Sequence, residues 1–162
     1  RRRRGCAQGT SKVAASARVT RAVLDANVFV SAVLTPTGTS GAVLEAWRSQ
    51  RFALLVSPAI LREVARVLVY PKVARRHGWS RKQIQAFVRD FADFAVLTPG
   101  EVALSVIRDD PDDDRYLECA VEGHAEHIVS GDQHLLALGA YEGITIVTPR
   151  TFLAALPATR RR

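Results

Sequence analysis

The sequence predicts an α/β fold in which a parallel, twisted sheet of four to five strands is flanked by helices. Strand-like and helical segments alternate from Arg21 to about Leu156, as they do when helices connect parallel strands. No internal repeat or linker divides this stretch. The chain has 162 residues, of which 48% are hydrophobic and 24% charged, enough for one domain with a proper core.

The first quarter of the folded stretch predicts two strands separated by two helices. The first strand, at about 21–25, contains an apolar run, and a short helix follows at roughly 27–34. A Thr-Pro-Thr-Gly-Thr turn then leads to a helix at about 40–48. Residues 52–56 form the second strand.

The next segment contains two clear helix starts. Ser57-Pro58 provides a capping hydroxyl and a proline at the first helical position, and Pro71 should end this helix at about Tyr70. Ser80 caps a helix at about 81–93, and residues 95–97 form a short strand. The apolar face of the second helix consists of Ile84, Phe87, Val88 and Phe91.

The last third repeats the alternation in shorter elements. A helix at about 113–123 carries an apolar stripe, and residues 126–130 form a strand. A short helix at 132–138 ends before a glycine, and the last strand covers 144–147. A final short helix covers about 150–155.

The net charge of +7 comes from the chain ends. Nine of the 23 Lys and Arg residues lie in residues 1–18 and 160–162, which leaves 14 for the rest of the chain against 16 Asp and Glu. Basic ends of this kind are usually disordered and bind polyanions non-specifically. We therefore expect a disordered basic arm at 1–19, one folded domain at 20–156 and a basic tail at 157–162.

The composition also bears on location. No apolar run approaches 18 residues, so we expect no membrane span, and the N-terminus lacks the apolar stretch of a secretory signal. Two cysteines are too few for a disulfide framework or a Cys-only zinc site. A reducing, cytoplasmic environment fits this cysteine usage.

Four acidic residues fall where a parallel sheet would bring them together: Asp25, Glu63, Asp114 and Asp132. Asp25 and Asp132 each follow an apolar run at a strand's carboxyl end, where sites form in open α/β sheets. The helices that carry the other two acids leave from the same edge. Because gathered carboxylates repel one another unless a cation lies among them, the pattern predicts a divalent metal site.

Each acid also has a structural explanation. Asp25 and Asp132 can cap the helices that follow them, and Glu63 can lie on the surface beside its helix's apolar stripe. The acidic run that ends at Asp114 suits a helix N-terminus, and periodicity does not decide between Asp113 and Asp114. The four histidines match no zinc pattern, so an oxygen-rich site favours Mg²⁺ or Mn²⁺ over Zn²⁺.

Four segments with specific order and spacing cover the acids. They are Val23-Leu-Asp-Ala-Asn-Val-Phe-Val-Ser-Ala32, Leu61-Arg-Glu-Val64, Asp109-Asp-Pro-Asp-Asp-Asp-Arg-Tyr-Leu-Glu-Cys-Ala120 and Ile128-Val-Ser-Gly-Asp-Gln-His-Leu-Leu136. Over about residues 21–153 the chain resembles the PIN-domain family, and within it the VapC-like toxin ribonucleases of bacterial toxin–antitoxin systems. The family places its third acid 18 positions before the fourth, which is the separation of Asp114 from Asp132 and selects Asp114 over Asp113.

The resemblance implies a three-layer PIN-like fold for residues 20–156 and a Mg²⁺- or Mn²⁺-dependent endoribonuclease activity. It implies catalytic and metal-binding roles for Asp25, Glu63, Asp114 and Asp132, with Asn27 and Ser130 supporting the metal shell. It also suggests a homodimer and a cognate antitoxin as partners.

A basic stretch accompanies the site. Residues 62–89 hold eight Lys and Arg but one acid, and the predicted RNA-binding residues are Arg62, Arg66, Lys72, Arg75 and Arg76. An ordinary solvated helical face explains the same pattern. Two other functions stay open: a catalytically silent PIN-fold module that binds RNA or protein, and a phosphatase with Asp25 as nucleophile. Asn27 argues against the phosphatase, which usually has a second Asp there.

Overall fold

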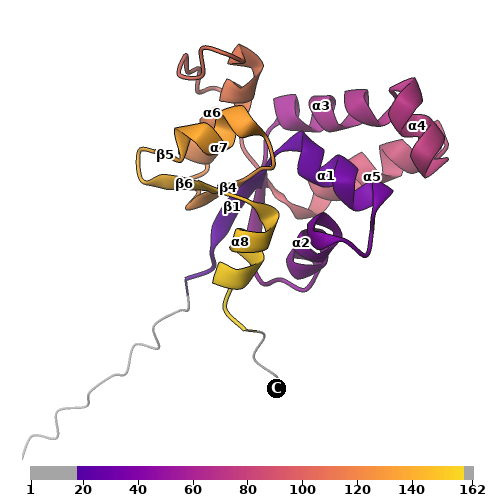
Figure 1. The fold of residues 1–162 in the computed structure, drawn as a ribbon, viewed down its shortest axis with the longest axis horizontal. Helices are drawn as coiled ribbons and strands as arrows, with labels where there is room; N and C mark the ends of the chain where they lie inside the picture. Colours follow the sequence, from indigo (N-terminus) through magenta and orange to yellow (C-terminus); the bar gives the residue numbers. More distant parts are fainter. Residues whose placement is uncertain (1–17, 159–162) are drawn as a thin grey trace, which may run out of the picture.

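The computed structural model describes residues 18–158, in which helices cover both faces of a six-stranded sheet (Figure 1). Residues 1–17 of the predicted arm and 159–162 of the predicted tail lie outside the described residues. The helix–sheet–helix layers confirm the α/β fold class and the mostly parallel sheet.

The sheet has the strand order β3-β2-β1-β4-β6-β5. All neighbouring strands pair in parallel except β5 and β6, which form an antiparallel hairpin at one edge. The strands are β1 (Arg21–Leu24), β2 (Ala53–Val56), β3 (Val96–Leu97), β4 (His127–Val129), β5 (Ala140–Tyr141) and β6 (Ile144–Val147). Because β1 and β4 are adjacent and parallel, residue 25 and residues 130–132 leave the sheet side by side.

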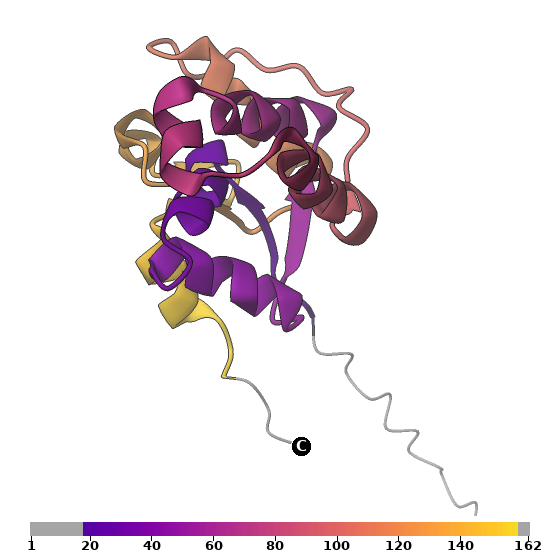
Figure 2. The ribbon, with the colours of Figure 1, turned by 90° about the vertical axis from the view of Figure 1, so that its right-hand side faces the viewer.

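Eight α-helices and one 3₁₀ turn surround the sheet in the described part of the chain (Figures 1 and 2). They are α1 (Ala26–Leu34), α2 (Thr39–Arg48), α3 (Pro58–Leu68), α4 (Pro71–His77), α5 (Arg81–Phe94), η1 (Pro111–Asp113), α6 (Asp114–Glu122), α7 (Gln133–Leu138) and α8 (Pro149–Ala155). Within residues 18–158, none of these helices has the length and apolar character that crossing a bilayer requires.

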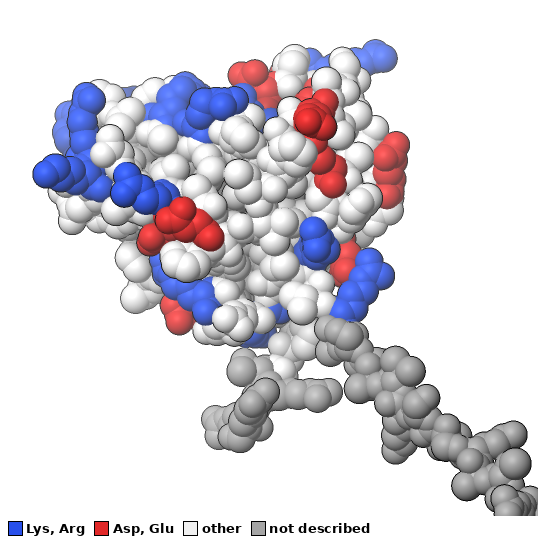
Figure 3. Space-filling view, turned by 180° about the vertical axis from the view of Figure 1, so that it is seen from behind, with Lys and Arg blue, Asp and Glu red and all other residues white. Residues whose placement is uncertain are grey.

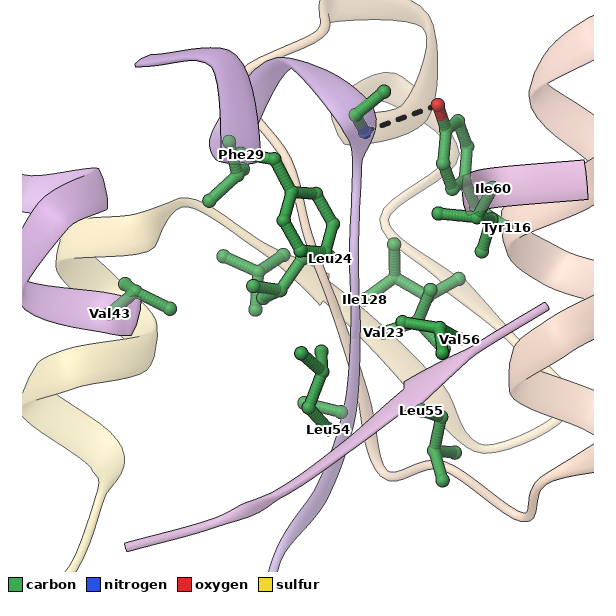
Figure 4. Packing of buried hydrophobic residues seen from close by; sticks show 14 of the residues in the cluster. Val23, Leu24, Phe29, Val43, Leu54, Leu55, Val56, Ile60, Tyr116 and Ile128 are labelled. Carbon is green, nitrogen blue, oxygen red and sulfur yellow. Dashed lines mark hydrogen bonds between the residues drawn. The ribbon is translucent and has the colours of Figure 1, made fainter. Parts of the chain in front are cut away.

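Strand side chains fill the core on two sides of the sheet. Val23, Leu55 and Ile128 are aligned across neighbouring strands and are fully buried. Tyr116 of α6 lies on their side of the sheet, whereas Phe29 of α1 lies on the opposite side (Figure 4). The packing of α6 against this face carries its N-terminal residues to the edge where Asp25 emerges.

Two elements differ from the sequence expectation. Pro71 does not simply stop the preceding helix, because it is also the first residue of α4, where its missing N–H is tolerated. The sheet has six strands rather than four to five, since the two-residue β5 forms a hairpin with β6. The hairpin turn has positive φ at Glu142 and Gly143, and this brief reversal leaves no apolar run in the sequence.

The long segment between β3 and η1 is held by acidic side chains of α6. Asp114 accepts hydrogen bonds from the backbone N–H groups of Val106 and Ile107, at 3.1 and 3.0 Å. One turn further, Glu118 accepts from the N–H of Leu104 at 2.9 Å. One more turn on, Glu122 accepts from the N–H groups of residues 100 and 101. We call Asp114, Glu118 and Glu122 the α6 clamp; their four-residue spacing puts them on one helix face.

Candidate active site

The site is built first from the ends of β1 and β4. Asp25 is 3% exposed, and its Oδ2 accepts a 2.6 Å hydrogen bond from the Ser130 hydroxyl. Its Oδ1 accepts from the N–H of Asn27, so the same carboxylate caps α1. Burial raises the pKa of Asp25, the Ser130 hydrogen bond opposes this effect, and the charge of Asp132 raises the pKa further.

Ser130 joins the two strand ends through one hydroxyl. While Oγ donates to Asp25, it accepts from the N–H of Asp132 at 2.9 Å. Asp132 in turn caps α7, because its Oδ1 accepts from the N–H groups of His134 and Leu135. The predicted supporting position at Ser130 is therefore a fully buried connection between two acids.

Asp113 is the third acid that faces this edge. Burial raises its pKa to about 7, and the charges of Asp110, Asp132 and Asp25 contribute in that order. Its Oδ2 is buried and has no hydrogen-bond partner in the described part of the protein. A buried oxygen without a donor next to two other carboxylates is unfavourable on its own and leaves a position open for a ligand.

Asp114, the acid that the family spacing pairs with Asp132, is bonded to the backbone of the segment before η1. Asp114 is 4% exposed, but both of its oxygens accept from backbone N–H groups of the segment that it clamps. Asp113 ends the 3₁₀ turn η1 and Asp114 begins α6, so the two neighbouring side chains leave the backbone in different directions. In this structure Asp113, and not Asp114, has a buried side-chain oxygen without a hydrogen-bond partner among the described residues.

Tyr116 is a further residue of the site that the sequence did not identify. Its hydroxyl accepts a hydrogen bond from the N–H of Ala26 at 3.2 Å, directly beside Asp25 (Figure 4). Burial is the main effect that raises the pKa of Tyr116. The negative charges of Asp25 and, more weakly, of Glu63 raise it further. Its position three residues after Asp113, on the apolar side of α6, was the available signal.

Glu63 is paired with two arginines in this structure. Arg66 donates Nε to Oε2 at 2.9 Å and Nη2 to Oε1 at 2.7 Å, and Arg115 of α6 donates Nη1 to Oε2 at 3.3 Å. The hydrogen bond from Arg66 lowers the pKa of Glu63, burial opposes it, and Arg115 lowers it further. Arg66 also donates to the Tyr70 hydroxyl. Glu63, the remaining acid of the predicted set, is therefore neutralised by two guanidinium groups.

The residues at the edge fit a hard divalent cation. The side chains of Asp25, Asp113 and Asp132 offer carboxylate oxygens, the ligands that hard divalent cations prefer, and Asp113 Oδ2 has no hydrogen-bond partner among the described residues. In residues 18–158 the side chains do not form a ready-made group of three or more His, Cys, Asp or Glu residues at metal-binding distances. A cation would therefore have to draw these carboxylates closer together.

The remaining predicted residues lie on the surface. Asn27 is exposed and contributes its backbone N–H to Asp25. The predicted RNA-binding side chains on α3 and α4 are exposed: Arg62, Arg66, Lys72, Arg75 and Arg76. In the view from behind, Lys and Arg gather over the end of the molecule formed by α4 and α5, and most acids lie on the other side (Figure 3).

Comparisons with known proteins give a family model, a relative and a similar fold. The family model of the PIN domain matches residues 21–134, a stretch that includes all the acids described above. An uncharacterized protein of Methanocaldococcus jannaschii, MJ1680, is 30% identical over 118 residues, which cover 73% of this chain and 74% of that protein. A chain of the crystal structure of VapBC2 from Rickettsia felis bound to a DNA fragment from their promoter is similar with a TM-score of 0.54. That similarity covers 78% of this chain and 97% of the other at 12% identity, and it concerns the fold.

Proposed function

The chain belongs to the PIN domain family, as its motifs predicted, and we propose that it is a divalent-metal-dependent endoribonuclease. The observation that carries the proposal is the buried Oδ2 of Asp113, which has no hydrogen-bond partner among residues 18–158 and lies within electrostatic range of Asp25 and Asp132. Three carboxylates held together at a strand edge are costly without a cation and useful with one. We assign this activity to residues 20–156.

The proposed ligands are Asp25, Asp113 and Asp132, with Glu63 joining them from α3. When Mg²⁺ or Mn²⁺ is bound, it supplies charge shielding for the scissile phosphate and lowers the pKa of a nearby water. Ser130 fixes the Asp25 carboxylate and the start of the Asp132 turn through one hydroxyl. Tyr116 holds the first backbone N–H of α1, which keeps Asp25 at the edge.

The proposed substrate is RNA, which must approach an acidic site along a basic surface. The exposed Lys and Arg side chains of α3 and α4 offset the repulsion between the carboxylates and a phosphate backbone. A similarity of fold to a chain of VapBC2 supports the further proposal that this protein is a toxin with a cognate antitoxin. A homodimer is part of the same proposal.

Replacement of Asp25 by Asn tests the activity. The amide keeps an acceptor for the N–H of Asn27, so the variant should fold, but it removes one charge from the site. We expect Mg²⁺- or Mn²⁺-dependent cleavage of single-stranded RNA to disappear while the circular dichroism spectrum is retained. Asp93→Asn, an exposed change on α5, is the matched control and should cleave normally. Cleavage by rigorously purified Asp25→Asn would refute the assignment.

The second candidate is a PIN-fold module that binds RNA without cutting it. The pairing of Glu63 with Arg66 and Arg115 favours this alternative, because it removes one of the four predicted acids from the site. Mn²⁺ titration separates the two functions, since a binding module needs no tight cation site. Saturable Mn²⁺ binding that is lost in Asp25→Asn favours the nuclease.

A further inference from the structure

An ion cluster joins α3 to α6 next to the candidate site. Both oxygens of Glu63 are occupied by guanidinium groups, from Arg66 on the same helix and from Arg115 across the helix pair. Arg115 is further fixed by donating Nε to the carbonyl oxygen of Asp112 at 2.6 Å. Only 21% of the Arg115 side chain and 17% of the Glu63 side chain is exposed, so this pair is better shielded from water than a surface ion pair.

The cluster lines an open pocket of about 520 Å³ between α3 and α6. The charged side chains of the pocket are Arg62, Arg66, Arg115, Glu63, Asp112 and Glu118. Three guanidinium groups in one pocket match the planar, bidentate recognition of phosphate. Three carboxylates balance them, so the pocket as it stands has little net attraction for a polyanion.

Tyr116 connects this pocket electrostatically to the aspartates. The charges of Asp25 and Glu63 both act on its hydroxyl, and Arg115 acts on it with the opposite sign. Glu63 is therefore within electrostatic range of the hydroxyl that lies beside Asp25. A cation among the aspartates would compete with the two arginines for the Glu63 carboxylate.

We propose that Arg66 and Arg115 are phosphate-binding residues that Glu63 masks until a cation binds, so that cation and RNA each strengthen the binding of the other. The inference rests on the proposed nuclease function and adds the residues that contact the substrate backbone. Withdrawal of Glu63 leaves the pocket with three guanidinium groups against two carboxylates. Because coupling between two binding events is reciprocal, RNA must raise the affinity for the cation by the same factor.

Glu63→Gln releases the two arginines without any cation and is the direct test. The probe is a labelled single-stranded oligoribonucleotide, and its dissociation constant is measured in EDTA over a series of salt concentrations. We expect Glu63→Gln to bind this RNA about tenfold more tightly than wild type, as two guanidinium–phosphate contacts form. The slope of log affinity against log salt should steepen by about 1.4, since each new single-strand phosphate contact contributes about 0.7.

Glu118→Gln is the matched control, because it removes one negative charge from the same pocket without freeing an arginine. It should tighten RNA binding by no more than about twofold and leave the salt slope unchanged. In Glu63→Gln combined with Arg66→Gln and Arg115→Gln, the gain in affinity and in slope should disappear. For wild type, saturating Ca²⁺ should steepen the slope as Glu63→Gln does in EDTA, with RNA integrity checked on a gel.

Equal effects of Glu63→Gln and Glu118→Gln would overturn the inference, because simple loss of charge would then explain both. A gain that persists in the triple variant would overturn it as well. If wild type cleaves RNA with Mg²⁺ and either result is obtained, only the masking inference fails. If wild type neither binds RNA in Ca²⁺ nor cleaves it in Mg²⁺, the proposed function fails and the inference fails with it.

Discussion

Asn substitution at two neighbouring positions tests which acid serves the proposed cation site and which serves the fold. Asp113→Asn and Asp114→Asn are the same chemical change, one residue apart. Within residues 18–158, Asp113 Oδ2 has no hydrogen-bond partner, whereas the Asp114 carboxylate accepts from the N–H groups of Val106 and Ile107. We therefore expect Asp114→Asn to lower the stability and keep cation binding, and Asp113→Asn to raise the stability without cations and lose cation binding.

The loss of stability expected for Asp114→Asn follows from the hydrogen bonds of the Asp114 carboxylate. A net contribution of about 1.5–3 kcal/mol is typical for a hydrogen bond to a charged group, and an Asn carbonyl oxygen keeps part of this interaction. Asp114→Asn should therefore lower the free energy of unfolding by about 2 kcal/mol. For a chain of this size, Tm should fall by about 4–8 °C.

At Asp113 the same substitution should increase the free energy of unfolding at high pH, because the pKa of Asp113 is raised from 3.8 to about 7 in the folded protein. The proton held by the folded state stabilises it fully below the unfolded pKa, and this contribution is lost as pH rises through about 7. Unscreened, the shift corresponds to about 4 kcal/mol, but the side chain is only half-buried, so solvent reduces this to about 1 kcal/mol. Without cations, Asp113→Asn should thus be about 1 kcal/mol more stable than wild type at pH 8 and equal to it near pH 4.

Thermal unfolding followed by circular dichroism measures both effects, in EDTA and in Mn²⁺. Saturation at about 100 times the dissociation constant should stabilise wild type by about 2.7 kcal/mol. Asp114→Asn should be stabilised by Mn²⁺ as much as wild type is, although it starts from a lower stability. Asp113→Asn should lose this stabilisation. If Asp114→Asn loses this stabilisation while Asp113→Asn keeps it, the assignment of the two side chains is reversed and the reasoning from their contacts is refuted.

Two further changes test the support of the site and of the fold. Ser130→Ala removes the hydroxyl that bonds the Asp25 carboxylate and the N–H of Asp132. The dissociation constant for Mn²⁺, measured by isothermal titration, should therefore rise about 10-fold to 100-fold. An unchanged constant would contradict the role of this hydroxyl. Gly41→Ala would place a Cβ 2.0 Å from the carbonyl oxygen of Pro36, so Tm should fall by the equivalent of about 1–3 kcal/mol. Gly131→Ala is the control, because its Cβ would meet nothing within 4 Å and Tm should stay unchanged. Equal Tm values for the two glycine variants would show that the turn before α2 yields without cost.

The sequence was most informative where a pattern repeats over several residues. Alternating strands and helices predicted the α/β class, and the helix starts at Ser57 and Ser80 were confirmed, since both hydroxyls cap their helices. The two-residue β5 and the seven-residue α4 were missed, although β3, α7 and α8 are as short and were predicted. No residue of α4 is buried, so no apolar stripe marks it in the sequence. Proline was ambiguous for a physical reason: it ends one helix and suits the first position of the next.

The site was predictable as a set of positions but not as a set of contacts. Asp25 and Asp132 follow from the parallel pairing of β1 and β4, which any sheet of this order imposes. The orientation of Asp113 depends on a change from 3₁₀ to α winding between two adjacent residues, and no periodicity in the sequence encodes it. The pairing of Glu63 with Arg115 joins residues 52 positions apart and follows only from the packing of α3 on α6.

The α6 clamp gives the loop before η1 its own anchors, independent of the sheet. The proposed cation site and the anchoring of this loop thus depend on adjacent but separable carboxylates on one short stretch of chain. Substitutions at position 113 can therefore probe the proposed cation site while the neighbouring aspartate keeps the loop in place.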